Sequence, residues 1–186
     1  MTLAELKRKV LVMIEEIDEN EASLTSDPDI DKKMNSVINQ VMYELARIKK
    51  IPDYVEIEVA KGDLIRFEDI TSESGYDVYQ LDSVRGIKYE AKARGTILKA
   101  MEDGILEIEY FRYPELINEK TKDTHELELS ADALEVLPYG VAGDLLKSDV
   151  STEYGAVYSK RFEEMLQRLD TRYSIGSFRF EGGVEI

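Results

Sequence analysis

The chain changes its hydrophobic period at residues 54–59, YVEIEV. Apolar residues alternate there with Glu56 and Glu58, which is the two-residue period of a strand with one buried face. Before residue 52 and after residue 129, apolar residues recur instead every three or four positions, the period of an amphipathic helix. The sequence therefore predicts an α+β protein in which helices from both ends of the chain flank an inserted β-rich segment.

The first 52 residues predict an N-terminal helical hairpin. One apolar stripe covers residues 3–17 and a second covers residues 30–48, with a polar break at 20–26 between them. Pro28 suits the first turn of the second helix, and Pro52 marks its end, because proline is tolerated at the start of a helix and not in its interior.

Residues 53–128 predict a small antiparallel β-sheet or sandwich with one charged face. Glycines separate short alternating runs, and Asp103-Gly104 is a typical hairpin turn. The runs lie at residues 54–59, 64–67, 76–81, 87–91, 96–101 and 105–113.

After a polar connection at 116–129, the helical period returns and predicts a C-terminal helical pair. We expect this pair to form one helical bundle domain with the N-terminal hairpin, so that residues 1–52 and 129–173 belong together. Residues 53–128 are then the insertion, and the glycine-rich residues 174–186 are a C-terminal extension.

Small residues and one proline characterise the first helix of this pair. Pro138 predicts a kink or a fresh start, because proline removes a backbone hydrogen bond from a helix. Gly140, Ala142 and Gly143 would let another helix come close. The last helix is expected to turn one face inward, formed by Tyr154, Val157, Tyr158, Phe162, Met165 and Leu169.

The 186 residues suffice for one domain, or for one domain that carries a substantial insertion. Thirty-nine acidic and 24 basic side chains give a net charge of −15, and residues 51–128 alone carry 19 acidic and 10 basic groups. This balance disfavours a protein that grips nucleic acid phosphates or an anionic membrane. The lack of cysteine excludes disulfides and thiolate sites. We expect a soluble cytoplasmic protein, because the sequence shows neither an apolar run of about 20 residues nor a signal peptide.

Catalytic and cofactor-binding motifs are absent from the sequence, so we expect no enzyme, no cofactor and no metal site. His125 stands alone in a polar segment, without a neighbour at metal-ligand spacing. Glu56 with Glu58, and Glu107 with Glu109, would suit magnesium binding or acid–base catalysis. The solvated face of a half-buried strand gives the same pattern, and we favour that interpretation.

Four stretches carry a resemblance to a known family. They are ELSADALEVLPYGVAGDLLKSD at 128–149, AVYSKRFEEMLQRL at 156–169, MNSVINQVMYELARI at 34–48 and GTILKAMEDGILEIEYFRYPELI at 95–117. Together with the order hairpin, β-rich insert and terminal helical pair, they resemble the head-to-tail connector (adaptor, or neck) proteins of tailed bacteriophages and prophages. The chain departs from the simplest, all-helical adaptors by its insert of about 75 residues.

The resemblance implies a structural virion protein that forms a ring, typically a dodecamer, under the phage portal protein. Such a ring extends the DNA channel and links the capsid to the next neck or tail protein. DNA would be non-specific cargo that passes through the channel, and no membrane would be involved. The protein would occupy the cytoplasm of the bacterial host during assembly and the virion neck afterwards. An acidic channel wall would repel DNA phosphates, which agrees with the net charge.

Three sets of residues are assigned roles in this ring. Tyrosine is as typical of a core as of a subunit interface, and helical positions with tyrosine or glycine are candidates for contact between subunits. The subunit-interface candidates are Tyr139, Tyr154, Tyr158, Gly140 and Gly143. The portal-docking candidates, which alternate as an added strand would, are Phe178, Phe180, Val184 and Ile186. The acidic channel-wall candidates are Glu56, Glu58, Glu107 and Glu109.

Two other classes of function remain open. The acidic charge of residues 51–128 would suit a cytoplasmic interaction module or a DNA-mimicking inhibitor. The paired glutamates are the only motive for a small metal-dependent enzyme.

Overall fold

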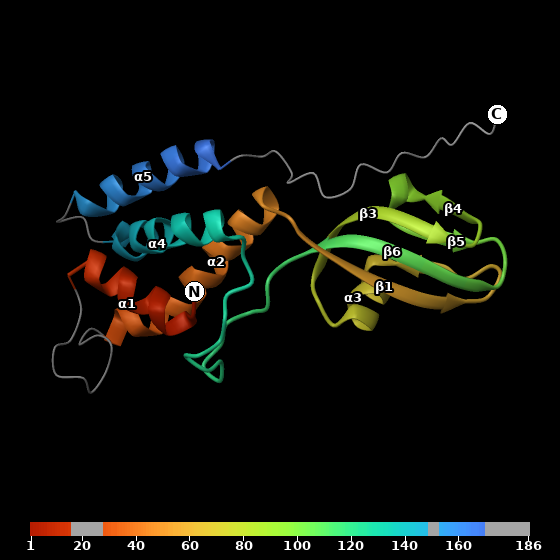
Figure 1. The fold of residues 1–186 in the computed structure, drawn as a ribbon, viewed down its shortest axis with the longest axis horizontal. Helices are drawn as coiled ribbons and strands as arrows, with labels where there is room; N and C mark the ends of the chain where they lie inside the picture. Colours follow the sequence, from red (N-terminus) through yellow and green to blue (C-terminus); the bar gives the residue numbers. More distant parts are fainter. Residues whose placement is uncertain (16–27, 149–152, 170–186) are drawn as a thin grey trace, which may run out of the picture.

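The computed structural model describes residues 1–15, 28–148 and 153–169 of the chain (Figure 1). A helical bundle forms one end of the molecule and a β-sandwich forms the other. The prediction of an α+β fold with an inserted small sheet is confirmed. Within the described residues, no helix has the length and the apolar character that crossing a lipid bilayer requires.

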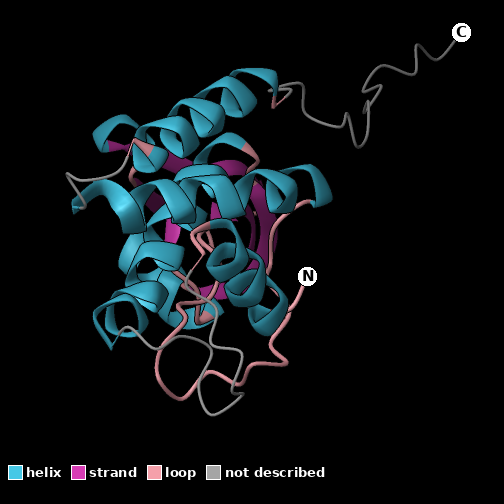
Figure 2. Cartoon of the chain, turned by 90° about the vertical axis from the view of Figure 1, so that its left-hand side faces the viewer, coloured by secondary structure: helices cyan, strands magenta, loops and turns pink. Residues whose placement is uncertain are grey.

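The bundle combines helices from both ends of the chain around one hydrophobic core. Seen from the bundle end of the molecule, these helices lie in front of the strands (Figure 2). Its helices are α1 (Leu3–Met13), α2 (Pro28–Ile48), α4 (Ala131–Leu145) and α5 (Tyr154–Arg168). A short 3-10 helix, Leu146–Ser148, follows α4. Helix α1 begins at a capping box, in which the Thr2 hydroxyl accepts from the backbone N–H of Glu5 at 3.2 Å and the Glu5 carboxylate accepts from that of Thr2 at 2.9 Å.

Helix α4 is the centre of the bundle, because α1, α2 and α5 all pack against it. It runs without interruption through Pro138, so the predicted fresh start at this residue is wrong. Pro138 is buried. The surrounding helices keep the chain helical even though proline cannot donate to the carbonyl four residues earlier.

Two glycines of α4 allow this close packing, as predicted. A Cβ atom on Gly140 would lie 2.7 Å from Val41 Cγ1 and 2.8 Å from Phe162 Cε2. On Gly143 it would lie 3.0 Å from the backbone nitrogen of Ser159. Both glycines therefore serve helix contacts inside the chain.

The predicted inner face of α5 is partly wrong. Phe162 and Leu169 are buried, but Tyr154 is 61% exposed and Val157 is 58% exposed. At its first turn the helix meets its neighbour through Gly155, which packs against the carbonyl of Leu146. This contact rotates the first turn of α5 so that Tyr154 and Val157 point outward.

The β-sandwich consists of two antiparallel sheets of three strands each. One sheet has the order β1-β6-β3, with β1 at Ile51–Val59, β6 at Gly104–Arg112 and β3 at Val78–Gly86. The other has the order β2-β5-β4, with β2 at Leu64–Arg66, β5 at Ile97–Ala100 and β4 at Tyr89–Lys92, which the 3-10 turn Ala93–Gly95 joins to β5. The six predicted runs thus correspond to six strands, although β3 extends further than predicted.

Apolar residues of both sheets share one core, which includes Ile65, Leu98, Leu106, Ile108 and Tyr110. Helix α3 (Phe67–Ser74), which the alternation pattern does not predict, adds Ile70 to this core. Its sequence carries the expected features of a helix, namely acidic residues in the first turn and Gly75 at the C-terminal cap with φ +75°.

The connection between β6 and α4 packs on the bundle. Ile117 and Leu127 are buried in the bundle core. Asn39 of α2 holds this connection twice, because its amide donates to the Ile117 carbonyl at 2.7 Å and accepts from the Ile117 N–H at 2.9 Å. The bundle therefore includes a non-helical segment from the return path of the chain.

Gly143→Val tests the close packing of α4 on α5. The added side chain meets the backbone of Ser159, which cannot move aside as a flexible side chain can. We expect the free energy of unfolding to fall by about 2 kcal/mol or more, since valine and glycine differ little in helix propensity and overpacking dominates. Urea unfolding measures this. The control, Ala156→Val on the exposed side of α5, is expected to change it by less than about 1 kcal/mol; equal losses would contradict the packing argument.

Candidate functional site

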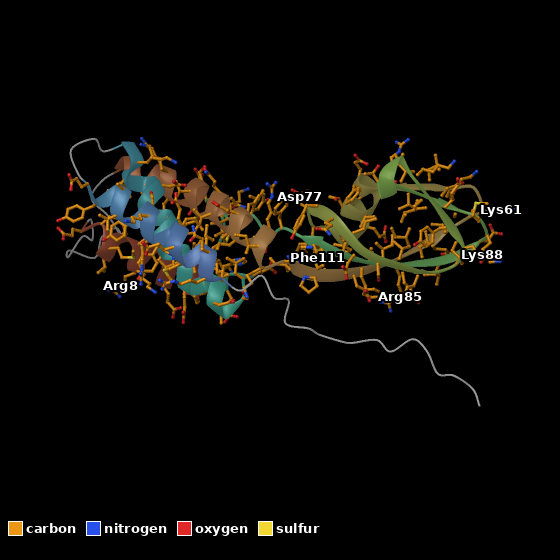
Figure 3. All side chains as sticks on the ribbon, turned by 90° about the horizontal axis from the view of Figure 1, so that it is seen from above. Arg8, Lys61, Asp77, Arg85, Lys88 and Phe111 are labelled. Atoms are coloured by element: carbon orange, nitrogen blue, oxygen red, sulfur yellow. The ribbon has the colours of Figure 1, made fainter. Side chains whose placement is uncertain are left out.

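The four predicted channel-wall glutamates lie together on the outer face of sheet β1-β6-β3, which we call the acidic face. Val55, Ile57, Leu106 and Ile108 point toward the core, and the alternating glutamates point away from it. The face comprises Tyr54, Glu56, Glu58, Ser83, Arg85, Ile105, Glu107 and Glu109. Figure 3 shows Arg85 on the outside of this sheet and Phe111 at its end next to the bundle.

Strand register places two like charges directly opposite each other, Glu56 on β1 and Glu107 on β6. Such a cross-strand pair is destabilising, because its side chains are about 5 Å apart. Arg85 on β3 lies directly opposite Glu107, and its Nη2 lies 2.6 Å from the carboxylate of Glu109, the one ion pair that the described residues form within this face. The Ser83 hydroxyl also donates to Glu109, at 2.6 Å. The acidic face therefore keeps most of its negative charge.

Tyr54 extends the hydrogen bonding on this face. Its hydroxyl donates to the carboxylate of Glu56. This hydrogen bond, with the negative charges of Glu56 and Glu107, raises the pKa of Tyr54 to about 12. The tyrosine consequently stays neutral and acts as a donor across the physiological range.

A buried arginine links the acidic sheet to the bundle. Arg112, at the end of β6, is 8% exposed. Its Nε lies 2.8 Å from the carboxylate of Asp53 on β1, and its Nη1 lies 2.8 Å from that of Glu128, just before α4. The guanidinium also covers the ring of Tyr76 at 3.8 Å from the centroid. The two strands that connect the sandwich with the bundle are thus tied together at one point.

The hydrogen bonds from Arg112 lower the pKa of the Glu128 carboxyl below its usual value. Burial acts in the opposite direction, and the backbone N–H of Glu115 adds a further hydrogen bond at 3.1 Å to the charged form. Glu128 therefore stabilises the fold as a carboxylate.

A tyrosine stack makes a second link between the two parts of the molecule. Tyr43 of α2 stacks on Tyr113, with ring centroids 4.2 Å apart, and Tyr79 of β3 lies 4.7 Å from Tyr113 on this cluster. Arg47 Nε donates to the Tyr113 hydroxyl at 2.7 Å, and the Tyr79 hydroxyl donates to the carbonyl of Ala46 at 2.9 Å. These tyrosines join α2 to the sandwich.

The subunit-interface candidates divide into three groups. Gly140 and Gly143 are buried inside the bundle and are not available to a neighbouring subunit. Tyr139 and Tyr158 are half-buried, and the Tyr158 hydroxyl donates to the carbonyl of Met13 in α1. Tyr154 alone presents most of its surface. The portal-docking candidates Phe178, Phe180, Val184 and Ile186 lie outside the described residues.

In the described part of the chain, no three His, Asp or Glu side chains are grouped suitably for a metal ion. His125 contributes its backbone, because its carbonyl accepts from the N–H of Leu3 at 2.9 Å. A hollow of about 500 Å³ is lined by Tyr76, Tyr113 and Leu116 and by the acidic residues Asp77 and Glu115.

No protein-family model matches the sequence, and no curated protein matches it.

Arg112→Met tests the buried link. Two carboxylates lose their cation, and we expect the free energy of unfolding to fall by roughly 2–4 kcal/mol, less than for a fully buried pair because Asp53 and Glu128 each keep about a third of their exposure. Arg85→Met is the control, since it breaks an exposed pair that contributes less than about 1 kcal/mol. Urea unfolding of both variants measures the difference. A loss for Arg112→Met no larger than for the control would refute the structural role of Arg112.

The lowered pKa of Glu128 predicts a pH dependence. Because the pKa is lower in the folded state, its contribution is complete above the pKa of an unfolded glutamate, about 4.3, and is lost as the pH falls through the folded value. Glu128→Gln should lower the free energy of unfolding by roughly 1–2 kcal/mol at pH 7 and progressively less at lower pH. Urea unfolding across this pH range measures the gap. The exposed Glu119→Gln should show no such convergence.

Proposed function

We propose that this chain is a head-to-tail connector of a tailed bacteriophage or prophage. It forms a ring under the portal protein, extends the DNA channel and carries the next neck or tail protein. It assembles in the cytoplasm of the bacterial host and ends in the virion neck. It needs no cofactor, and DNA passes through it as cargo.

The observation that carries this proposal is the two-part architecture. The two ends of the chain build one helical bundle, and the β-sandwich extends from one end of that bundle (Figure 1). The four stretches that resemble connector proteins fall on the corresponding elements, namely α2, α4, α5 and the β5-β6 hairpin. The fold therefore agrees with the element order on which the resemblance rests.

The links between the two parts support the same function. A ring of defined size closes only if each subunit presents its contact surfaces at a fixed angle. Arg112 and the tyrosine stack around Tyr113 connect the sandwich to the bundle at two places. A subunit built this way keeps its surfaces in one relative orientation.

The net charge of −15 also suits a protein that surrounds moving DNA. A negative wall repels phosphates, so DNA slides without binding. The channel-wall role of Glu56, Glu58, Glu107 and Glu109 stays a prediction, because a sheet face that carries them can line the channel or meet a neighbouring subunit.

Electron microscopy of the protein mixed with portal rings encoded beside it tests the proposal. We expect rings, or caps on the portal, and a mass that corresponds to several copies. Tyr154→Ala should weaken portal-dependent assembly about tenfold without changing thermal stability, because the side chain is exposed on α5. Tyr89→Ala, a second exposed tyrosine on β4, is the control. A protein that ignores every such portal at all concentrations would rule out the connector function.

A further inference from the structure

The β-sandwich carries a second charged surface on the side opposite the acidic face. Ile65, Leu98 and Ala100 of sheet β2-β5-β4 point into the shared core, so the alternate residues of these strands face outward. This outer surface, which we call the basic face, comprises Leu64, Arg66, Glu90, Lys92, Ile97 and Lys99. Three cations stand against one carboxylate on it, in a protein whose net charge is −15.

Strand register gathers these cations although they lie far apart in the sequence. Lys99 on β5, the central strand, pairs with Leu64 on one side and Glu90 on the other. The adjacent outward row joins Arg66 to Ile97 and Ile97 to Lys92. The only ion pair between these residues links Lys92 and Glu90 at 3.8 Å. Arg66 and Lys99 form no ion pair with any described residue.

Both faces also expose large apolar side chains next to their charges. Leu64 on the basic face is 47% exposed, and Ile105 and Tyr54 on the acidic face are 48% and 52% exposed. Charge of opposite sign together with exposed apolar surface is what two faces that meet in a contact require. The like-charge pair Glu56 and Glu107, unfavourable within one chain, would be relieved by cations from another.

We propose that the basic face of one copy docks on the acidic face of the next copy. The two faces lie on opposite sides of one sandwich, so this contact is heterologous, and its repetition generates a ring or a helical array. The occupant of each face is a second copy of this chain because the matching charge pattern is present on the same domain. This contact defines how neighbouring subunits meet in the proposed connector ring. It rests on the proposed function only for the number of copies in the ring.

The absence of cysteine makes this contact directly testable. Lys99→Cys and Glu107→Cys place one thiol at the centre of each face, on the middle strands β5 and β6. The two variants, distinguished by mass, are mixed at high concentration and oxidised. We expect the ratio of mixed disulfides to same-variant disulfides to exceed the ratio given by random pairing about fivefold, the factor produced by about 1 kcal/mol of net attraction.

The matched control replaces Lys99→Cys with Arg8→Cys. Arg8 is also an exposed cation, but it lies on α1 in the bundle, away from the sandwich (Figure 3). Random pairing is expected for this mixture with Glu107→Cys. A mixed disulfide from Lys99→Cys that does not exceed this control overturns the proposal.

Charge reversal separates attraction from chance proximity. Adding Arg66→Glu and Lys92→Glu to the Lys99→Cys chain should abolish the excess of the mixed disulfide. Adding Glu56→Lys and Glu58→Lys to the Glu107→Cys chain should then restore this excess. Failure to restore it, with both variants folded by circular dichroism, would show that these faces do not meet.

The outcome is independent of portal binding. Portal caps without an excess of the mixed disulfide would leave the connector function standing, free the acidic face to line the channel and reject this contact. An excess without portal binding would keep the contact between copies and reject the connector function.

Discussion

The buried guanidinium of Arg112 is the interaction on which the arrangement of the whole molecule depends. The sandwich joins the bundle through two covalent crossings, the start of β1 and the end of β6, and Arg112 binds a carboxylate beside each. A cation that is only 8% exposed cannot lose these partners without a large desolvation cost. Arg112 therefore holds Asp53 and Glu128 close together. This contact at the end of β6 sets the orientation of the sandwich relative to the bundle. The tyrosines around Tyr113 add apolar area to the same junction.

The packing of the bundle depends on a different constraint, namely the small residues on one side of α4. Gly140 and Gly143 allow Phe162 and the backbone of Ser159 to approach, which places α5 directly on α4. The tight packing in turn keeps Pro138 inside a continuous helix. It also determines which residues of α5 remain outside, and Tyr154 is exposed because Gly155, its neighbour, makes the close contact. Assembly through α5 would therefore use the surface that the glycine contact leaves free.

The hydrophobic period, and the alternation of inward-facing and outward-facing residues along each strand, predicted much of this structure. The features that they missed depend on contacts between residues far apart in the sequence. Alternation at 54–59 and 105–113 identifies the strands and places Glu56, Glu58, Glu107 and Glu109 on one face. It does not give the register, so the opposition of Glu56 and Glu107 became visible only in the fold. Arg112 is one charged residue at a strand end, and its partners are 59 and 16 positions away. The basic face was missed for the same reason, since Arg66, Lys92 and Lys99 come from three strands. Helix α3 was missed because its eight residues are too few to establish a helical period.

Opposite charge on the two faces of one domain has a consequence for how copies associate. Salt screens both the repulsion that a net charge of −15 causes between copies and the attraction between the faces over about one Debye length, roughly 10 Å, but the attraction falls off faster with distance because it depends on how the charges are arranged on each face. Free subunits in solution thus meet a barrier before they feel the attraction. A template that holds subunits side by side removes that barrier, because it brings the subunits together. The charges of the two faces then determine how neighbouring subunits align. In the proposed connector the portal would be this template, and the opposite charges of the two faces would order the subunits in the ring.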